Sequence, residues 1–162
     1  MIRIPLSKNL TALVDDADAA SIGRIKWSAL NGRRTMYATA RMRGKYIYMH
    51  RHILGPPPFK NAQVDHVNGD GLDNRRANLR WASPSHNNMN QQKRLGGLTS
   101  RFKGVSLRKN RAKCWYAYIF FNKKQISLGY FVSEQSAAQA YNQAAIKYFG
   151  EFAKLNPMEG VP

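Results

Sequence analysis

Two adjacent residues with side chains suited to metal binding and proton transfer, Asp65 and His66, lie near the start of the segment VDHVNGDGLDNRRANLRW, residues 64–81. Adjacent residues of a strand point to opposite faces, so one side chain can bind a metal while the other faces a different atom of the substrate. A neutral imidazole near a phosphate can act as a general base on water. The segment therefore predicts hydrolytic chemistry, provided that neighbouring elements bring further ligands close.

Three short elements are expected to position this pair. QVDHV and LRWAS read as strands joined by a polar loop, and SPSHNNMNQQKRL reads as a helix because a Ser followed by Pro suits a helix start. The helix carries Asn87 and Asn90, whose amide oxygens could reach Asp65. A carboxylate and an amide oxygen with open positions beside them suit Mg²⁺. Asn78, at the end of the loop, could hold the imidazole of His66 in the productive tautomer.

The order of strand, loop, strand and helix, with VDHV, NLRWAS and NNMN in place, resembles the HNH, or ββα-metal, nuclease motif. The version is that of phage and intron-encoded homing endonucleases. The resemblance implies His66 as the general base, oriented by Asn78, and it implies Asp65 and Asn87 as ligands of one divalent ion. The last histidine of the family name is an asparagine here, which favours Mg²⁺ or Mn²⁺ over zinc.

Two other interpretations of this segment were weighed. An isolated Asp-His pair beside a turn of Asn, Gly and Asp is usually an ordinary polar turn, and only the full order of elements favours a site. An EF-hand would need acids at alternating positions and a Glu at the twelfth, which no starting point supplies. The second metal ligand remains open between Asn87, His86 and Asn90.

A second module is expected after residue 100. Its sequence predicts three strands with basic turns and then an amphipathic helix, capped by Ser133 and ended by Gly150. In CWYAYIFF, alternate residues such as Ala117 and Ile119 should face the alanine-rich side of the helix, with Tyr118 on the outer face. Through KGV, WYAYI, LGYF, AAQAYNQAAIKYFG and a final LN, residues 100–156 resemble the DNA-binding domain of plant ethylene-response factors, the APETALA type. That family places its three-stranded sheet in the major groove.

The candidate DNA contacts come from both modules. On the outer face of the sheet, we expect Arg108 to read guanine and Gln125 adenine, while cations in the turns meet phosphates or simply lie in solvent. MHRHILGPPP resembles the segment that precedes the nuclease motif, so His50, Arg51 and His52 are expected at phosphates. The full set of expected contacts is Arg51, Arg75, Arg76, Arg80, Lys103, Arg108, Lys109, Arg111, Tyr118 and Gln125.

Composition limits the partners. The net charge is +17, an excess whose usual use is the binding of nucleic acid. Cys114 is the only cysteine, which excludes an internal disulfide and a cysteine-based zinc cluster. The chain shows no secretory signal and no apolar run near the roughly 18 residues of a membrane span. We expect double-stranded DNA and no membrane as partner, in the cytoplasm of a bacterial host, with the phage origin that the resemblance implies.

Together these observations predict an α+β protein: a strand-rich N-terminal region with a ββα-metal motif, then a three-stranded antiparallel sheet on one helix. We expect a nuclease region at 1–93 with its core at about 61–93, a linker at 94–99 and a DNA-binding domain at 100–156.

The expected activity is site-specific, metal-dependent hydrolysis of a DNA phosphodiester by a monomer, which has one active site and so nicks one strand. The N-terminal part would position the DNA. The alternative is a non-catalytic, sequence-specific regulator with a decayed nuclease centre, against which the intact site residues argue. An RNA-binding protein ranks last, because only charge and aromatic residues favour it.

Overall fold

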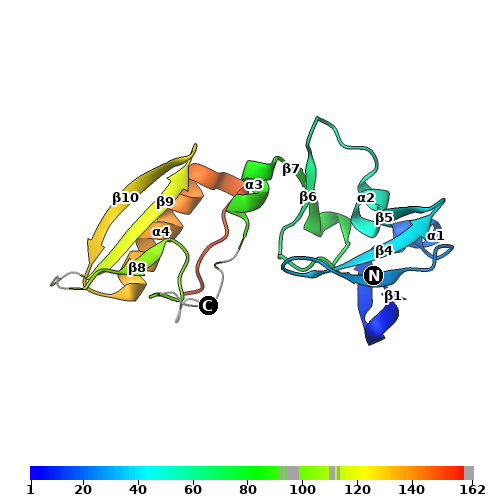
Figure 1. Ribbon diagram of the computed structural model, residues 1–162, viewed down its shortest axis with the longest axis horizontal. Coiled ribbons are helices and arrows are strands. Elements are labelled where there is room, and N and C mark those ends of the chain that lie inside the picture. Colours follow the sequence, from blue (N-terminus) through cyan, green and yellow to red (C-terminus); the bar gives the residue numbers. More distant parts are fainter. Residues whose placement is uncertain (92, 94–98, 110–111, 113, 159–162) are drawn as a thin grey trace. The chain divides into compact units, whose positions relative to one another are not determined.

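The structure is a computed structural model that describes residues 1–91, 93, 99–109, 112 and 114–158. The chain divides into two compact units, Met1–Asn88 and Met89–Pro162. The expected linker at 94–99 lies outside the described residues apart from Thr99. Within the part of the chain that is described, every helix is too short or too polar to cross a bilayer. The expected α+β class is confirmed, since both units combine small antiparallel sheets with helices (Figure 1).

The first unit begins with two small antiparallel sheets. A hairpin pairs β1 with β2, with Ile2 opposite Val14. The order of the next sheet is β3-β4-β5. The bounds of these elements are β1 Ile2–Pro5, η1 Ser7–Asn9, β2 Thr11–Val14, η2 Asp16–Asp18, α1 Ala19–Ile22, β3 Ser28–Asn31, β4 Met36–Met42 and β5 Lys45–Tyr48.

The second half of this unit has the predicted order of strand, loop, strand and helix. β6 and β7 pair antiparallel, which places Asp65 opposite Arg80 and His66 opposite Leu79. A short helix, α2, precedes the pair. The bounds are α2 Met49–Leu54, β6 Gln63–His66, η3 Arg76–Asn78, β7 Leu79–Ala82 and α3 Pro84–Met89.

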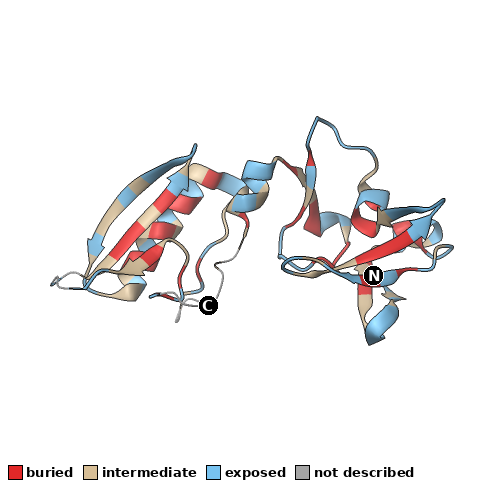
Figure 2. Ribbon diagram, viewed as in Figure 1, coloured by how far each residue is buried: buried red, intermediate tan, exposed pale blue. Residues whose placement is uncertain are grey.

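One apolar core joins these elements. β2 alternates between buried and half-buried residues, so Ala12 and Val14 point inward. α2 contributes Met49 and Ile53 from one face, and β7 contributes Leu79. The buried residues of the core are Ala12, Val14, Ile22, Trp27, Ala38, Ala40, Met49, Ile53 and Leu79. The hairpin at the N-terminus therefore packs in the same core as the candidate site (Figure 2).

The second unit is a three-stranded antiparallel sheet of order β10-β9-β8 with one long helix. Asn122 and Lys123 form the β9–β10 turn with positive φ values of 49° and 62°, as a two-residue type I′ hairpin turn requires. Ser133 caps the helix by accepting from the Ser136 amide, as predicted. The bounds are β8 Val105–Leu107, β9 Trp115–Phe121, β10 Lys124–Phe131, α4 Glu134–Phe149 and η4 Gly150–Phe152.

The core of this unit lies between β9 and the alanine side of α4. Ala117 and Ile119 point toward the helix, as the alternation predicted, and Figure 2 shows both elements coloured as buried along this contact. Small side chains let a helix lie close to a sheet. At the end of the helix, Phe149 is buried, whereas Tyr148 is half-buried and packs with its ring 5.2 Å from that of Phe121.

Gly104 gives a direct test of this packing. Its φ is +71°, and a Cβ there would lie 2.0 Å from the Tyr141 ring and 2.5 Å from the Tyr118 carbonyl oxygen. Gly150 also has positive φ, but a Cβ there meets open space. Both alanine substitutions place a side chain at positive φ, which strains the backbone by about 1–3 kcal/mol. Gly104→Ala should cost about 1–3 kcal/mol more, because it overpacks the core.

Hydrogen exchange of the β9 amides in the full chain measures this difference, since it reports the unfolding free energy of this unit alone. Equal losses for Gly104→Ala and Gly150→Ala would contradict the packing described here.

Candidate active site

Asp65 and His66 are adjacent on β6 and both buried, with exposed fractions of 3% and 6%. Because successive strand residues point to opposite faces, the two side chains meet different surroundings. The carboxylate of Asp65 accepts a hydrogen bond from Arg80 Nε on β7, at 2.8 Å from Oδ2. Arg80 Nη2 also lies at ion-pair distance from the same oxygen, at 2.8 Å. A buried carboxylate needs such a partner, so the cross-strand pair fixes the side chain of Asp65.

A cluster of rings surrounds the imidazole of His66. The ring of His50, from α2, meets it edge-on with centroids 5.1 Å apart, and the Tyr37 ring lies at 5.9 Å. Tyr48, the last residue of β5, stacks on His50 at 5.2 Å. The rings come from three different elements, so the packing of the first unit as a whole determines where the imidazole lies.

Burial sets the protonation of both histidines. It lowers the pKa of His66, although the Asn74 side chain and the nearby carboxylates act in the opposite direction. Burial, followed by the charges of His66 and Arg51, lowers the pKa of His50 from 6.5 to about 3. A neutral imidazole is the form that can accept a proton from water.

His50 differs from its expected place at a phosphate. It lies on the inward side of α2 and is buried, whereas Arg51 and His52 are exposed. Its Nδ1 atom is buried and makes no hydrogen bond with any residue that the structure describes. Met49, His50 and Ile53 lie on the core side of α2. Their helical spacing could have predicted that His50 is buried, and sequence reasoning missed this signal.

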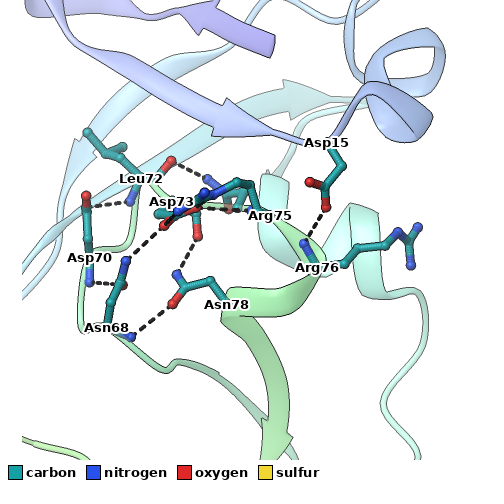
Figure 3. Close-up of polar contacts among 9 residues, drawn as sticks. Asp15, Asn68, Asp70, Leu72, Asp73, Arg75, Arg76 and Asn78 are labelled. Carbon is teal, nitrogen blue, oxygen red and sulfur yellow. Dashed lines mark hydrogen bonds and ion pairs between the residues drawn. The ribbon is translucent and has the colours of Figure 1, made fainter. Parts of the chain in front are cut away.

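The loop between β6 and β7 is held together by its own side chains (Figure 3). Asn68 donates from Nδ2 to Asp73 Oδ2 at 2.9 Å, and its Oδ1 accepts from the Asp70 amide at 2.8 Å. Arg75 donates to both carboxylate oxygens of Asp73, at 2.8 and 2.6 Å. The Arg75 guanidinium lowers the pKa of Asp73. These contacts give a loop rich in Asn, Gly and Asp one defined conformation.

Asn78 closes this loop. Its Oδ1 accepts from the Asn68 amide at 2.9 Å and its Nδ2 donates to the Asp73 carbonyl at 2.8 Å (Figure 3). The asparagine that acts on the pKa of the His66 imidazole is Asn74, which is fully buried. The loop holds several asparagines, and nothing in their spacing singled out Asn74.

Three of the arginines expected at DNA take part in ion pairs within the first unit. The distances are 2.6 Å for Arg75 to Asp73, 2.7 Å for Arg76 to Asp18 and 2.8 Å for Arg80 to Asp65. The side chains of Arg75 and Arg76 remain 42% and 54% exposed, whereas that of Arg80 is 16% exposed. Arg80 therefore has a role inside the site, and contact of these arginines with DNA stays a prediction.

Asn87 lies on α3, in the same unit as Asp65. Its Nδ2 donates to the Gln63 side-chain oxygen at 2.9 Å. This bond does not use the amide oxygen of Asn87, which is the atom that a metal would bind. His86 is exposed on the same helix, and Asn90 is buried in the second unit. The described residues contain no group of three His, Cys, Asp or Glu side chains suited to a metal. The expected ligand set, one carboxylate and one amide, does not require such a group.

The outer face of the second unit's sheet carries a row of aromatic rings. Tyr116 stacks with Tyr118 at 5.7 Å and lies 4.9 Å from the Tyr130 ring. The Arg108 guanidinium lies over the Tyr116 ring at 5.5 Å, and Gln125 donates to the Tyr116 hydroxyl at 3.4 Å. Arg108 and Gln125 thus share one face with the expected reader Tyr118.

Three further cations were expected at DNA in this unit. The ammonium of Lys103 donates to the Met89 carbonyl at 2.6 Å and ties two segments of the unit together. Lys109 is exposed, and Arg111 lies outside the described residues.

Residues 47–89 match the family model described as HNH endonuclease. A relative from Acanthamoeba polyphaga mimivirus, called an uncharacterized HNH endonuclease, is 34% identical over 96 residues, or 59% of this chain and 48% of that protein. The chain thus spans about half the length of this curated relative. No solved structure matches. The family match ends at residue 89, so the APETALA-type resemblance stays a prediction.

The low pKa of His50 has a consequence for stability. Between pH 6.5 and about 3, unfolded His50 binds a proton that the folded protein excludes. The free energy of unfolding should therefore fall as the pH drops below 6.5, by up to about 1.4 kcal/mol per pH unit for this group. His50→Phe keeps an aromatic ring but cannot bind a proton, so it should reduce the dependence of the unfolding free energy on pH. The pH dependence that comes from His66 should remain.

Urea unfolding between pH 7.5 and 4.5 measures the slope. Ile53→Val is the matched control, since it should cost about 1 kcal/mol at every pH and leave the slope unchanged. An unchanged slope in His50→Phe would show that His50 is not buried as a neutral ring.

Proposed function

We propose that this protein is a DNA endonuclease of the HNH type, with His66 as the general base for hydrolysis of a phosphodiester. The observation that carries this proposal is the burial of His66 in a cluster of rings, next to the paired Asp65, within the segment that matches the HNH endonuclease model. A hydrolytic base must be neutral, fixed in position and close to an electrophilic centre. The surroundings of His66 meet the first two of these requirements.

Asp65 and Asn87 are the proposed ligands of a divalent ion, and their chemistry fits Mg²⁺ or Mn²⁺. A carboxylate oxygen and an amide oxygen are hard ligands, and Mg²⁺ commonly takes one or two of them and fills its other positions with water and phosphate. When bound, such an ion stabilises the negative charge that develops on the phosphate. Arg80 would hold the Asp65 carboxylate in place, because its guanidinium binds Oδ2 across the hairpin.

The protein's own groups account for the remaining steps. The neutral imidazole of His66 would take a proton from water at a ring nitrogen as the water attacks phosphorus. The P–O bond to the departing sugar oxygen then breaks, and that oxygen takes a proton from solvent. The rings of Tyr37 and His50 pack against the imidazole and would limit its rotation, and Tyr48 supports His50 by stacking on it. Asn78 would contribute indirectly, by closing the loop that carries the other contacts of the site.

The second unit is the proposed sequence reader. Its sheet presents Tyr118, Arg108 and Gln125 on one face, a combination that can stack on or hydrogen-bond with base edges in the major groove. Two modest DNA-binding units on one chain gain affinity through effective concentration. A monomer with one site would nick one strand of double-stranded DNA. The viral relative supports a virus-encoded protein, and a phage in a bacterial cytoplasm stays our expectation.

A non-catalytic DNA-binding regulator is the alternative. The ion pair between Asp65 and Arg80 favours it, because a carboxylate held by a guanidinium must rearrange or share its oxygens when a metal binds. The overall charge of +17 fits both functions equally.

Cleavage separates these two functions. Supercoiled plasmid and genomic DNA of the source should be nicked at defined sites with Mg²⁺ or Mn²⁺ and remain intact with EDTA. His66→Ala should reduce the single-turnover cleavage rate by about 10²–10⁴-fold, because the general base is lost. Its DNA affinity should stay within about twofold of wild type, measured by mobility shift at 50 and 200 mM salt. If wild type and His66→Ala both bind DNA tightly and neither cleaves it with Mg²⁺ or Mn²⁺, the endonuclease proposal is wrong and the non-catalytic regulator is favoured.

Sequence reading by the second unit can be tested at Arg108. Arg108→Ala should weaken binding to the mapped site by about 1–3 kcal/mol and change binding to an unrelated duplex much less, since a base contact is lost. Lys147→Ala, an exposed cation on α4, is the control because the helix packs on the other face of the sheet. Fluorescence anisotropy with both duplexes gives the comparison. An equal loss on both would assign Arg108 to phosphate contact instead.

A further inference from the structure

A small cavity in the second unit is lined mostly by cations. Its volume is about 230 Å³, and none of the described residues that line it is acidic. The lining comes from segments outside the strands and α4, so it does not include the row of aromatic rings on the sheet. Four like charges around one cavity repel one another, which a bound anion would relieve. The cations of this pocket, called the cation pocket below, are Lys93, Arg101, Lys103 and Lys154, and residues 155–157 complete the lining.

Asn156 builds one wall of the cation pocket. It is buried, and its side chain bonds to both backbone groups of Lys103: Oδ1 accepts from the amide at 2.6 Å, and Nδ2 donates to the carbonyl at 3.0 Å. The backbone of Asn156 bonds in turn to the side chain of Asn142 on α4, at 2.8 and 2.9 Å. The chain that follows the helix is therefore fastened to the segment before β8, so the fold itself brings Lys103 and Lys154 to one cavity.

Backbone carbonyls hold two of the ammonium groups in place. Lys93 Nζ donates to the Phe102 carbonyl at 2.7 Å and to the Val105 carbonyl at 3.0 Å. Lys103 Nζ donates to the Met89 carbonyl at 2.6 Å. A carbonyl is neutral, so it orients an ammonium without cancelling its charge. An ammonium has three donors, so Lys93 retains one donor beyond these two bonds.

Glu134, in the first turn of α4, supplies part of the counter-charge near the pocket. Its Oε1 accepts from the Arg101 amide at 3.2 Å. Burial lowers the pKa of Lys93, and the charge of Glu134 acts in the opposite direction. This one carboxylate cannot balance four cations, so positive charge remains in excess around the cavity. An anion bound there would be attracted by that excess.

The pocket has the chemistry of a phosphate site. A phosphate spreads its negative charge over several oxygens, so several cations can bind it at the same time. A guanidinium binds two such oxygens as a fork, and an ammonium binds as a compact point charge. With one arginine and three lysines, the pocket offers both kinds of contact. The net charge of +17 on the whole chain fits a partner rich in phosphate.

We propose that the cation pocket binds one phosphate of the DNA backbone and so places the second unit on the strand whose bases its sheet reads. The choice of DNA as the source of the phosphate rests on the proposed function, whereas the affinity for a phosphate group does not. Phosphate contacts set the register and orientation of a protein on DNA and carry no sequence information. Loss of the pocket should therefore weaken binding to every duplex alike, unlike loss of Arg108.

The first test uses inorganic phosphate and needs neither DNA nor cleavage. Amide ¹H–¹⁵N spectra of the labelled full chain are recorded with sodium phosphate or with sodium chloride at equal ionic strength. The amides of Lys103 and Asn156 should shift in a saturable manner with phosphate only. Lys154→Gln removes one charge from the pocket and should weaken phosphate binding by about three- to tenfold. Lys147→Gln makes the same charge change on α4, outside the lining, and should leave phosphate binding unchanged.

The second test uses DNA. The affinity of the full chain for an unrelated duplex is measured by fluorescence anisotropy between about 50 and 200 mM salt. Lys154→Gln should reduce the slope of log affinity against log salt by about 1, because one phosphate contact is lost. Lys147→Gln should keep the wild-type slope. Arg101→Gln should repeat the result of Lys154→Gln, and it replaces that variant if the latter does not fold.

The outcomes separate the phosphate site from the proposed function. If phosphate shifts the two amides no more than chloride does, the site is overturned. A saturable phosphate shift with an unchanged salt slope in Lys154→Gln overturns the DNA part and leaves a site for free phosphate. Equal changes in Lys154→Gln and Lys147→Gln overturn the pocket, since only overall charge then matters. If wild type shows the expected slopes but cleaves no DNA, the endonuclease proposal fails and the phosphate site is upheld.

Discussion

The structure of the site depends on the burial of a loop that is too polar to be buried without internal partners. Residues 67–78 are mostly Asn, Gly, Asp and Arg, yet Asp73, Asn74 and Asn78 are all buried. An unsatisfied polar group in the interior costs about 1–3 kcal/mol. The contacts of Asn78 and Asp73 meet this requirement only in one arrangement of the backbone. The same arrangement buries Asn74, whose side chain acts on the pKa of His66, so the conformation of the loop also sets the surroundings of the imidazole.

Strand geometry then separates two kinds of chemistry that are one residue apart. Asp65 pairs with a guanidinium, whereas His66 faces the rings of Tyr37 and His50, and burial lowers its pKa. A proton acceptor and a carboxylate oxygen can therefore lie close together without forming an ion pair with each other. The β6–β7 hairpin provides this separation because its side chains alternate between faces.

Much of the fold was predictable, because its signals are local. Alternation marked β6, β7 and β9, and Ser133 and Gly150 marked the ends of the long helix. The site was predictable only in part, because its other members come from distant segments. No periodicity indicates that Leu13 pairs with a loop near residue 73, or that a histidine of α2 turns toward His66. The effect of Asn74 on the pKa of His66 depends on backbone conformation, which residue type alone does not determine, and the orienting role of Asn78 stays a prediction.

The acidic residues show how so basic a chain can build a site for a polyanion. Nine acids face 26 lysines and arginines, and six of the nine lie between residues 15 and 73. Three of the six, Asp18, Asp65 and Asp73, each pair with an arginine of the hairpin loop or of β7. Left unpaired, carboxylates this close to the imidazole would repel an approaching phosphate.

Paired with arginine, the same carboxylates orient the loop and contribute little net negative charge. The arginines of the candidate site are therefore needed first to neutralise its acids. If DNA is the partner, as we propose, the cations elsewhere on the chain would supply the attraction for it. This division accounts for the ion pairs of Arg75, Arg76 and Arg80, which composition alone would assign to phosphate contact.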